Sequence, residues 1–175
     1  SDPECSDHSY TDQYAAIIVP QTRGRVLDLG SGYGYIADEI AARAEVSHVI
    51  AIDKLAPSEF RSHNPKIRYV PADLRTVQKL PSPADVVVAA EFIEHVTERD
   101  FLRLLPKIRD SLRPGGIFIG STPLNPSDKE VFSGSPYHLH EYRPETLDAM
   151  LRKFFKTVRI EKISDVCIAW EAKKD

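Results

Sequence analysis

Short apolar runs recur along the chain and are separated by segments with a different periodicity. Each run is four to six residues long and is rich in Val, Ile and Ala. Runs of this length and composition, bounded by turn-forming residues, predict buried β-strands. The predicted strands are Arg25–Leu29, His48–Ile52, Ile67–Val70, Ala84–Ala89 and Gly116–Ser121.

The segments between the strands have the spacing and the end signals of helices. Thr97 is followed three residues later by Asp100, a capping box with Asp in place of Glu, which predicts the start of the longest helix. The sequence Arg113-Pro114-Gly115-Gly116 ends that helix and turns into the next strand. The predicted helices are Tyr10–Val19, Tyr35–Ala44, a short one at Pro57–Ser62, Glu98–Leu112 and Pro144–Lys153.

Two strands close the chain. The runs Thr157–Lys162 and Val166–Lys173 are joined by the short turn Ser164-Asp165, so they form a hairpin and the last strand is antiparallel to its neighbour. Alternation of strands and helices before this hairpin predicts a mainly parallel α/β sheet. No internal repeat or low-complexity linker divides the chain, so residues 1–175 are expected to form one domain with a short helical segment at 9–22.

Composition narrows the class of protein. The chain has 175 residues, of which 42% are hydrophobic and 28% charged, as in a globular domain with one core. Its net charge of −3 and pI of about 6.1 give no global attraction for nucleic acid, which is therefore not favoured as a partner. Cys5 and Cys167 form no disulfide or metal-ligand pattern. Without an apolar run of spanning length or a secretory signal, a cytoplasmic location is expected.

The strongest chemical signal follows the first strand, where glycines stand at 30, 32 and 34 before a helix. Such a turn lets a ligand approach the main chain, and the N-terminus of the helix faces it, which together predict a cradle for a nucleotide-type cofactor. The spacing is G-x-G-x-G and not the dinucleotide pattern G-x-G-x-x-G. Asp28, two residues before Gly30, would repel a pyrophosphate but suits a cofactor with a positive centre or an ammonium group.

The pattern Asp28-x-Gly30-x-Gly32-x-Gly34 resembles motif I of class I S-adenosylmethionine (SAM) methyltransferases, and the resemblance extends from Arg25 to Lys173. It implies an α/β fold in which a three-layer, Rossmann-like arrangement surrounds a seven-stranded, mostly parallel sheet. The implied strand order is 3-2-1-4-5-7-6 with strand seven antiparallel. It also implies SAM as cofactor and S-adenosylhomocysteine (SAH) as product, bound outside the carboxyl ends of the strands.

Acids after the next two strands are the further cofactor candidates. Asp53 ends the second strand about twenty residues after the glycines, where a carboxylate can accept both hydroxyls of a ribose. Lys54 follows and would flank the adenosine. The resemblance implies that Asp73, after the third strand, meets the adenine amino group and that Leu74 packs on the ring. Asp73 as a plain turn-forming residue is the competing interpretation.

The fourth strand leads into Glu91, Glu94 and His95, spaced so that a helical turn would place them on one face. Such a face can hold Mg²⁺ or Mn²⁺, or can supply a general base, and His138 lies further along the chain. The pattern resembles small-RNA 3′-end 2′-O-methyltransferases, which implies Glu91, Glu94, His95 and His138 as metal ligands. It also resembles ubiquinone-pathway and sugar or natural-product methyltransferases, in which this position is often not a metal site.

Three interpretations of this group stay open: a metal site, a metal-free catalytic or substrate-binding role, and a structural role. In the catalytic one, His95 is the first candidate for the base because an imidazole titrates near working pH, His138 is the second, and Glu94 assists. In the interpretation without a catalytic role, Glu91 lines the methionine end of the cofactor pocket, Glu94 is a solvated helix residue and His95 is a core histidine.

A long loop from Ser121 to Pro136 is expected to form one wall of the acceptor pocket. Its Thr122-Pro123-x-Asn125 resembles the Thr-Pro-Asn of many small-molecule and sugar methyltransferases, with Leu124 inserted. Tyr10, Tyr14 and Tyr137 are candidate aromatic walls. About 24 residues precede the first strand, from which a small lid and an open acceptor site are expected.

Together these features predict a SAM-dependent methyltransferase that modifies a hydroxyl, or less readily an amine, of a small molecule or glycan. One alternative is a metal-dependent RNA 3′-end 2′-O-methyltransferase. A non-catalytic SAM-binding partner subunit and an NAD-dependent oxidoreductase are alternatives of other classes. Asp28 and the missing dinucleotide spacing count against the oxidoreductase.

Overall fold

The computed structural model describes residues 8–175, with side chains described from residue 13 onward. Seven strands form one sheet in the order β3-β2-β1-β4-β5-β7-β6. Neighbouring strands are parallel except that β7 is antiparallel to both β5 and β6. The expected order is therefore confirmed. The strands are β1 (Gly24–Leu29), β2 (Val46–Asp53), β3 (Ile67–Pro71), β4 (Ala84–Ala90), β5 (Leu112–Pro123), β6 (Thr157–Lys162) and β7 (Cys167–Lys173).

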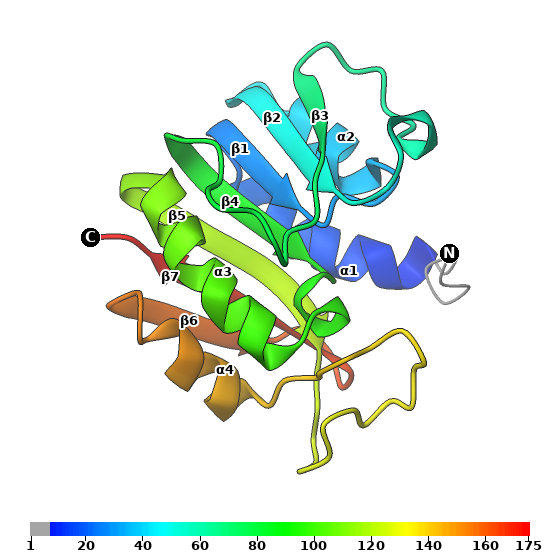
Figure 1. Cartoon of the computed structure of the whole chain (residues 1–175), viewed down its shortest axis with the longest axis vertical. Helices are drawn as coiled ribbons and strands as arrows, with labels where there is room; N and C mark the ends of the chain where they lie inside the picture. Colours follow the sequence, from blue (N-terminus) through cyan, green and yellow to red (C-terminus); the bar gives the residue numbers. More distant parts are fainter. Residues whose placement is uncertain (1–7) are drawn as a thin grey trace.

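Helices cover both faces of this sheet, which gives the expected three layers. Figure 1 shows α3 and α4 in front of the sheet and α1 and α2 behind it. No helix in the described part of the chain is long and apolar enough to span a membrane. The α-helices are α1 (His8–Ile18), α2 (Tyr35–Ala42), α3 (Glu98–Ser111) and α4 (Pro144–Leu151), and short 3₁₀ turns are η2 (Val19–Gln21), η3 (Pro57–Glu59) and η4 (Ile93–His95).

Successive residues of the central strands enter two different cores. Val86 and Val88 of β4 belong to the core beneath α1 and α2, whereas Val87 and Ala89 belong to the core beneath α3 and α4. A strand that is buried on both faces needs apolar residues at nearly every position. This is why the central strands appear in the sequence as continuous apolar runs.

Helix α3 begins after the predicted N-cap residue, Thr97. The Thr97 hydroxyl oxygen accepts a hydrogen bond from the Asp100 backbone N–H at 3.1 Å, and the hydroxyl donates to Asp100 Oδ2 at 2.8 Å. The carboxylate therefore returns to the Thr97 side chain, whereas in a capping box it would accept from the Thr97 backbone N–H.

The largest boundary error concerns β5, which was predicted as Gly116–Ser121 and runs from Leu112 to Pro123. At its far end Thr122 pairs with Ile168 and Pro123 with Cys167 of the antiparallel strand β7. These two positions are part of the strand because β7 pairs with them. Their residue types alone do not predict a strand. The other predicted boundaries are within three residues of the observed ones.

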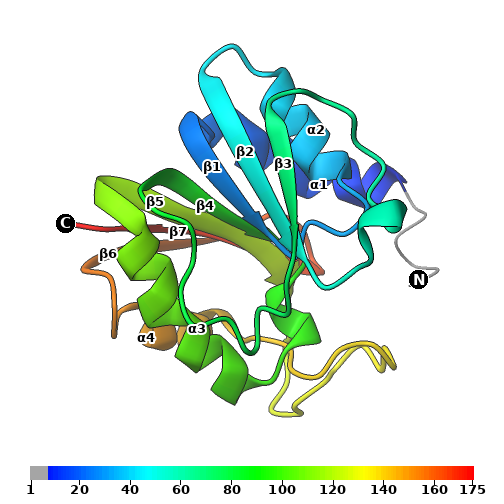
Figure 2. The ribbon, with the colours of Figure 1, turned by 45° about the horizontal axis from the view of Figure 1, so that its top comes forward.

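The carboxyl ends of β1, β2, β4 and β5 lie at one edge of the sheet, because these strands are parallel. The long segment 124–143, yellow in Figure 2, extends from the end of β5 at this edge. The register pairs Asp28 of β1 with Val88 of β4, so the glycine turn after β1 lies beside the segment that follows β4. All the candidate site residues are therefore gathered at one edge.

We expect Gly120→Ala to destabilise the sheet strongly. A Cβ at this position would lie 2.2 Å from the Ala89 carbonyl oxygen and 2.3 Å from the Trp170 ring. Both neighbours belong to the packed sheet, so the free energy of unfolding should fall by about 3 kcal/mol. Urea unfolding followed by circular dichroism measures the change.

Gly115→Ala is the control for this substitution. A Cβ at Gly115 would meet no atom of the described part of the chain within 4 Å, although its φ of +77° makes a side chain strained by about 1 kcal/mol. A loss for Gly120→Ala no larger than that for Gly115→Ala would show that close packing at Gly120 is not the constraint.

Candidate active site

The glycine turn after β1 has the conformation that its sequence requires. Gly30, Gly32 and Gly34 all have positive φ, at 72°, 53° and 97°. A Cβ on Gly30 would lie 2.3 Å from the Phe92 ring, and one on Gly34 would lie 2.7 Å from the Phe60 ring. No atom of the described residues lies within 4 Å of the equivalent position on Gly32. The outer glycines therefore permit close packing within the protein, and the middle one borders open space.

Asp53 holds the end of β2 against this turn. Its Oδ2 accepts a hydrogen bond from the Gly32 N–H at 2.9 Å, and its Oδ1 accepts one from the Leu55 N–H at 3.0 Å. The Gly30 N–H donates to the Ile52 carbonyl oxygen at 2.8 Å. The structure thus brings Asp53 to the glycine turn, and its side chain is only partly buried.

Asp28 is the buried acid of this group, with only 2% of its surface exposed. Burial, and secondarily the charge of Asp53, raises the pKa of the Asp28 carboxyl to about 7. Its Oδ2 is buried and has no hydrogen-bond partner among the described residues. A nearby positive charge stabilises the ionised form of such a buried carboxyl, which agrees with a cofactor that carries a positive centre.

Asp73 lies after β3, where its side chain is engaged locally. Its carboxylate accepts from the Arg75 Nε at 2.9 Å and the Arg75 Nη2 at 2.6 Å, and it also accepts from the Arg75 backbone N–H. The hydrogen bonds from the Arg75 side chain hold the pKa of Asp73 down at about 2. Leu74 is buried in the core beneath α3, and Lys54 is exposed. The contacts of these three residues with adenosine stay predictions.

The expected helical face of Glu91, Glu94 and His95 is wrong. Glu91 has a φ of 48° and lies before the short turn η4, so Glu91 and Glu94 do not belong to one helix. The Glu91 carboxylate instead lies 3.7 Å from the Cys167 Sγ. The ligand atoms of Glu94, His95 and His138 lie within 4.8 Å of one another, and Glu91 is not part of this group. We call these three residues the Glu94–His95–His138 cluster.

Glu94 is deeply buried, not solvated, with 1% of its surface exposed. Its Oε2 accepts a hydrogen bond from the Thr122 hydroxyl at 2.9 Å, and its Oε1 lies 3.8 Å from the His95 Nε2. Burial, and then the charge of Glu91, raises the pKa of Glu94 well above its ordinary value. Its backbone carbonyl accepts from the Leu139 N–H at 2.7 Å, which fastens the 124–143 segment to η4.

The two histidines of the cluster are each held through Nδ1. The His95 Nδ1 lies 3.0 Å from the Tyr137 carbonyl oxygen, and the His138 Nδ1 lies 2.6 Å from the Glu141 Oε1. Their rings are 5.2 Å apart at an interplanar angle of 77°. The His95 side chain is 37% exposed, so it is not a core histidine, whereas the His138 side chain is 10% exposed.

Sequence reasoning missed Glu141, which organises the loop around the cluster. Besides His138 it contacts the Ser133 hydroxyl, and its Oε2 accepts from the backbone N–H groups of Phe132 and Ser133 at 2.7 and 3.0 Å. Although burial opposes it, the hydrogen bonds from His138 and Ser133 together lower the pKa of Glu141. An acid three residues after a candidate base was the available signal.

Asn125, the last residue of the Thr-Pro-Leu-Asn sequence, stabilises this loop through hydrogen bonds. Asn125 is buried, and its amide donates to the carbonyl oxygens of Lys129 and Glu141 at 2.6 and 3.2 Å. Its Oδ1 accepts from the Ser127 N–H at 2.9 Å. The amide therefore closes the loop on itself, and Leu124 does not prevent this.

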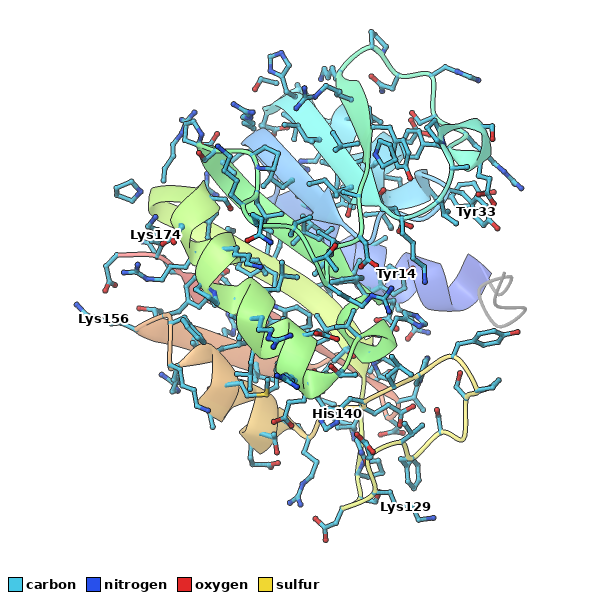
Figure 3. The ribbon with its side chains drawn as sticks, in the orientation of Figure 1. Tyr14, Tyr33, Lys129, His140, Lys156 and Lys174 are labelled. Carbon is cyan, nitrogen blue, oxygen red and sulfur yellow. The ribbon has the colours of Figure 1, made fainter. Side chains whose placement is uncertain are left out.

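The aromatic candidates occupy different positions. Tyr14 is 5% exposed and packs in the core beneath α1 and α2, whereas Tyr137 is 46% exposed. The side chain of Tyr10 lies outside the described residues. Figure 3 labels Tyr14 on α1 and His140 on the 124–143 segment, at the edge of the sheet that carries the site. Phe132 and Leu139 of this segment are exposed apolar residues.

Comparison with known proteins identifies the family. A family model described as a methyltransferase domain matches residues 8–156, which is most of the chain. The chain belongs to this methyltransferase family. The fold, with its strand order and antiparallel β7, agrees with this, so the resemblance to class I SAM-dependent methyltransferases is confirmed.

Individual relatives are similar to this methyltransferase domain at moderate identity. A probable SAM-dependent methyltransferase of Mycobacterium tuberculosis is 29% identical over 141 residues, covering 77% of the chain and 49% of the relative. A relative from Mycolicibacterium smegmatis, described in the same words, is 29% identical over 132 residues, 72% of the chain and 49% of its own length. The methyltransferase domain spans about half the length of these curated relatives.

Solved structures share its fold. The complex of DhpI with SAH has a TM-score of 0.79 at 18% identity, covering 98% of this chain and 89% of that one. The 1,6-didemethyltoxoflavin-N1-methyltransferase of Burkholderia thailandensis has a TM-score of 0.74 at 19% identity, covering 98% of this chain and 83% of that one. At this identity the likeness concerns the fold alone.

We expect Asp28→Asn to stabilise the cofactor-free methyltransferase domain at high pH. The carboxyl ionises near its ordinary value of 3.8 when unfolded and at about 7 when folded, so the folded chain binds more protons between these values. Stability from this group is therefore present below pH 4 and lost as the pH rises through 7. The advantage of the variant should grow by about 4 kcal/mol between pH 4 and pH 8.

Urea unfolding of both proteins across this pH range measures the difference. Other titrating groups are common to both and cancel. An advantage that does not change with pH would show that Asp28 is ionised in the folded chain throughout the range.

Proposed function

We propose that the methyltransferase domain transfers a methyl group from SAM to a hydroxyl group of a small molecule or glycan. The observation that carries this is the position of the Glu94–His95–His138 cluster beside the glycine turn. Phe92, two residues before Glu94, packs directly against Gly30. This proximity supports a role for the cluster in accepting a proton next to the proposed cofactor cradle.

The cofactor fit rests on two observations at the cradle. The buried Asp28 Oδ2 lacks a hydrogen-bond partner among the described residues, and the position above Gly32 is open. A ligand with positive charge would compensate the first, and a ligand lying on the backbone would use the second. The residues proposed to hold SAM are Asp28, Gly30, Gly32, Gly34, Asp53, Lys54, Asp73, Leu74 and Glu91.

Asp53 is proposed to bind the ribose. Its carboxylate already lies at the turn and has acceptor capacity beyond the two backbone N–H groups that it holds. Lys54, Asp73 and Leu74 would border the adenosine, and Glu91, which follows β4 directly, would border the methionine end. Asp73 would meet the adenine amino group while it also keeps its pairing with Arg75.

SAM supplies an activated methyl group, so the chain's own residues have to align the acceptor and remove its proton. Bound SAM would give its methyl group to the acceptor oxygen and, with its carbon–sulfur bond broken, would leave as SAH. The hydroxyl proton passes to the cluster, where the His95 Nε2 is the first acceptor and His138 the second. The Glu94 Oε1 lies 3.8 Å from the His95 Nε2, where its carboxylate form would stabilise the resulting imidazolium.

The acceptor pocket is proposed to have an apolar rim. Phe132, Tyr137 and Leu139 are each at least 45% exposed on the segment that also carries His138. Exposed apolar side chains on the segment that carries His138 favour an acceptor with an apolar or aromatic part beside its hydroxyl.

Cofactor titration tests the first half of the proposal. In calorimetry SAM and SAH should bind, whereas NAD should not, because its pyrophosphate would face Asp28. Asp53→Asn should weaken SAH binding about 10- to 100-fold, since it removes charge-assisted hydrogen bonds to the ribose.

Asp85→Asn is the matched control for Asp53. Asp85 also accepts a backbone hydrogen bond, from Arg25 at 2.8 Å, but it lies at the opposite edge of the sheet. Its substitution should leave SAH binding unchanged. Binding of NAD without SAM or SAH would overturn the proposal.

Proton removal is tested with histidine variants. In a screen of hydroxyl acceptors with labelled SAM, His95→Ala and His138→Ala should each lower kcat about 10²- to 10⁴-fold, while SAH binding persists. His48→Ala, on the exposed amino half of β2, is the control and should keep full activity. Full activity in both cluster variants would exclude the cluster from catalysis.

A further inference from the structure

Glu141 is buried, with 2% of its surface exposed, and hydrogen-bond donors surround its carboxylate. Its Oε2 accepts from the backbone N–H groups of Phe132 and Ser133, and its Oε1 accepts from the Ser133 hydroxyl. The same Oε1 lies 2.6 Å from the His138 Nδ1. Although burial opposes it, the hydrogen bonds from His138 and Ser133 lower the pKa of Glu141, so the group is a carboxylate at neutral pH.

The neighbours of the His138 Nδ1 determine where the ring proton lies. An ionised carboxylate can only accept a hydrogen bond, so Nδ1 donates to Glu141 at 2.6 Å. The Ser133 hydroxyl lies 3.3 Å from the same nitrogen and donates its own proton to Glu141, so toward Nδ1 it is an acceptor as well. In the neutral ring the proton is therefore on Nδ1, and Nε2 carries the lone pair.

Backbone contacts hold this pair at the candidate active site. The residue after His138, Leu139, donates its N–H to the Glu94 carbonyl oxygen at 2.7 Å. The Glu141 carbonyl oxygen accepts from the buried Asn125 amide at 3.2 Å. The imidazole and its carboxylate partner are therefore both anchored where the segment 124–143 meets η4.

We propose that Glu141 is a positioning residue, which holds His138 in the Nδ1–H tautomer so that Nε2 can take the proton of the acceptor hydroxyl. The inference rests on the proposed function, in which His138 is one of two proton acceptors. A carboxylate on the other nitrogen of a catalytic imidazole fixes its tautomer and orientation and stabilises the imidazolium that forms. Glu141 acts through His138 and does not touch the acceptor.

The proton transfer is balanced. The hydroxyl O–H bond breaks and an N–H bond forms at the His138 Nε2, while the acceptor oxygen takes the methyl group and SAM becomes SAH. The positive charge of the imidazolium then faces the Glu141 carboxylate at 2.6 Å. Once the products have left, the imidazolium gives its proton to water and His138 is neutral again.

Glu141→Gln distinguishes this role from one in loop structure alone. The amide oxygen of Gln can still accept the backbone hydrogen bonds of Phe132 and Ser133. Its NH₂ group would face the His138 Nδ1 and donate to it, which moves the ring proton to Nε2. Such a ring cannot accept a proton at Nε2, although the loop keeps its hydrogen bonds.

Nitrogen-15 NMR of the histidine rings measures the tautomer in the full chain without any methyl transfer. At a pH where the ring is neutral, we expect the Nδ1–H form of His138 in the wild type and the Nε2–H form in Glu141→Gln. His138→Ala assigns the signal. The control is Glu130→Gln, which removes a carboxylate of the same segment, 3.7 Å from the His140 Nδ1, and should leave the tautomer of His138 unchanged.

Kinetics with a hydroxyl acceptor from the screen supply the second measurement. Glu141→Gln should lower kcat about 10²- to 10⁴-fold, while the KM for the acceptor and the affinity for SAH stay as in the wild type. Glu141→Asp keeps the charge and should recover part of the lost kcat. Glu130→Gln should keep full activity, and circular dichroism verifies the folding of every variant.

An Nε2–H tautomer of His138 in the wild type would overturn the inference, as would a fall of kcat in Glu141→Gln without a change of tautomer. Full kcat in Glu141→Gln beside an impaired His138→Ala would overturn it too. All three results leave the proposed function standing, because SAH binding and methyl transfer by the wild type are measured separately. Absence of both in the wild type would contradict the proposed function itself.

Discussion

The parallel pairing of β1 with β2 and β4 is the constraint on which the site depends. Parallel strands end at the same edge, so the loops that follow them meet there although they are far apart in the sequence. Through this pairing Asp53 reaches the Gly32 N–H, and Phe92 packs on Gly30. The antiparallel β7 extends the same edge by pairing with the last residues of β5, which include Thr122.

The three buried carboxylates of the described residues, Asp28, Glu94 and Glu141, all lie at this edge, and their hydrogen bonds differ. Glu141 accepts hydrogen bonds from His138, Ser133 and Phe132, which lower its pKa despite burial. Asp28 and Glu94 have fewer donors, and burial raises the pKa of each. In the described part of the chain the Asp28 Oδ2 has no hydrogen-bond partner, whereas Glu94 contacts the Thr122 hydroxyl and lies near the His95 ring.

The 124–143 segment is ordered by polar contacts and carries few buried apolar side chains. Asn125 closes its first part, Glu141 holds its centre, and the Glu94 carbonyl fastens its return to η4. The apolar side chains of Phe132 and Leu139 take no part in these polar contacts and are exposed. The same carboxylate that orders the loop also fixes the ring of His138.

The sequence by itself determined the strands, the terminal hairpin, the glycine turn and the place of Asp53. These follow from local rules, since apolar runs, turn glycines and short connections act between neighbours along the chain. Only the tertiary structure decided that Glu91 lies outside the cluster and that Glu141 contacts His138. The spacing of Glu91 and Glu94 presupposes a helix, but the chain turns sharply at a φ of 48° on leaving β4. The partner of His138 was fixed by the folding of a long loop, for which no periodic pattern exists.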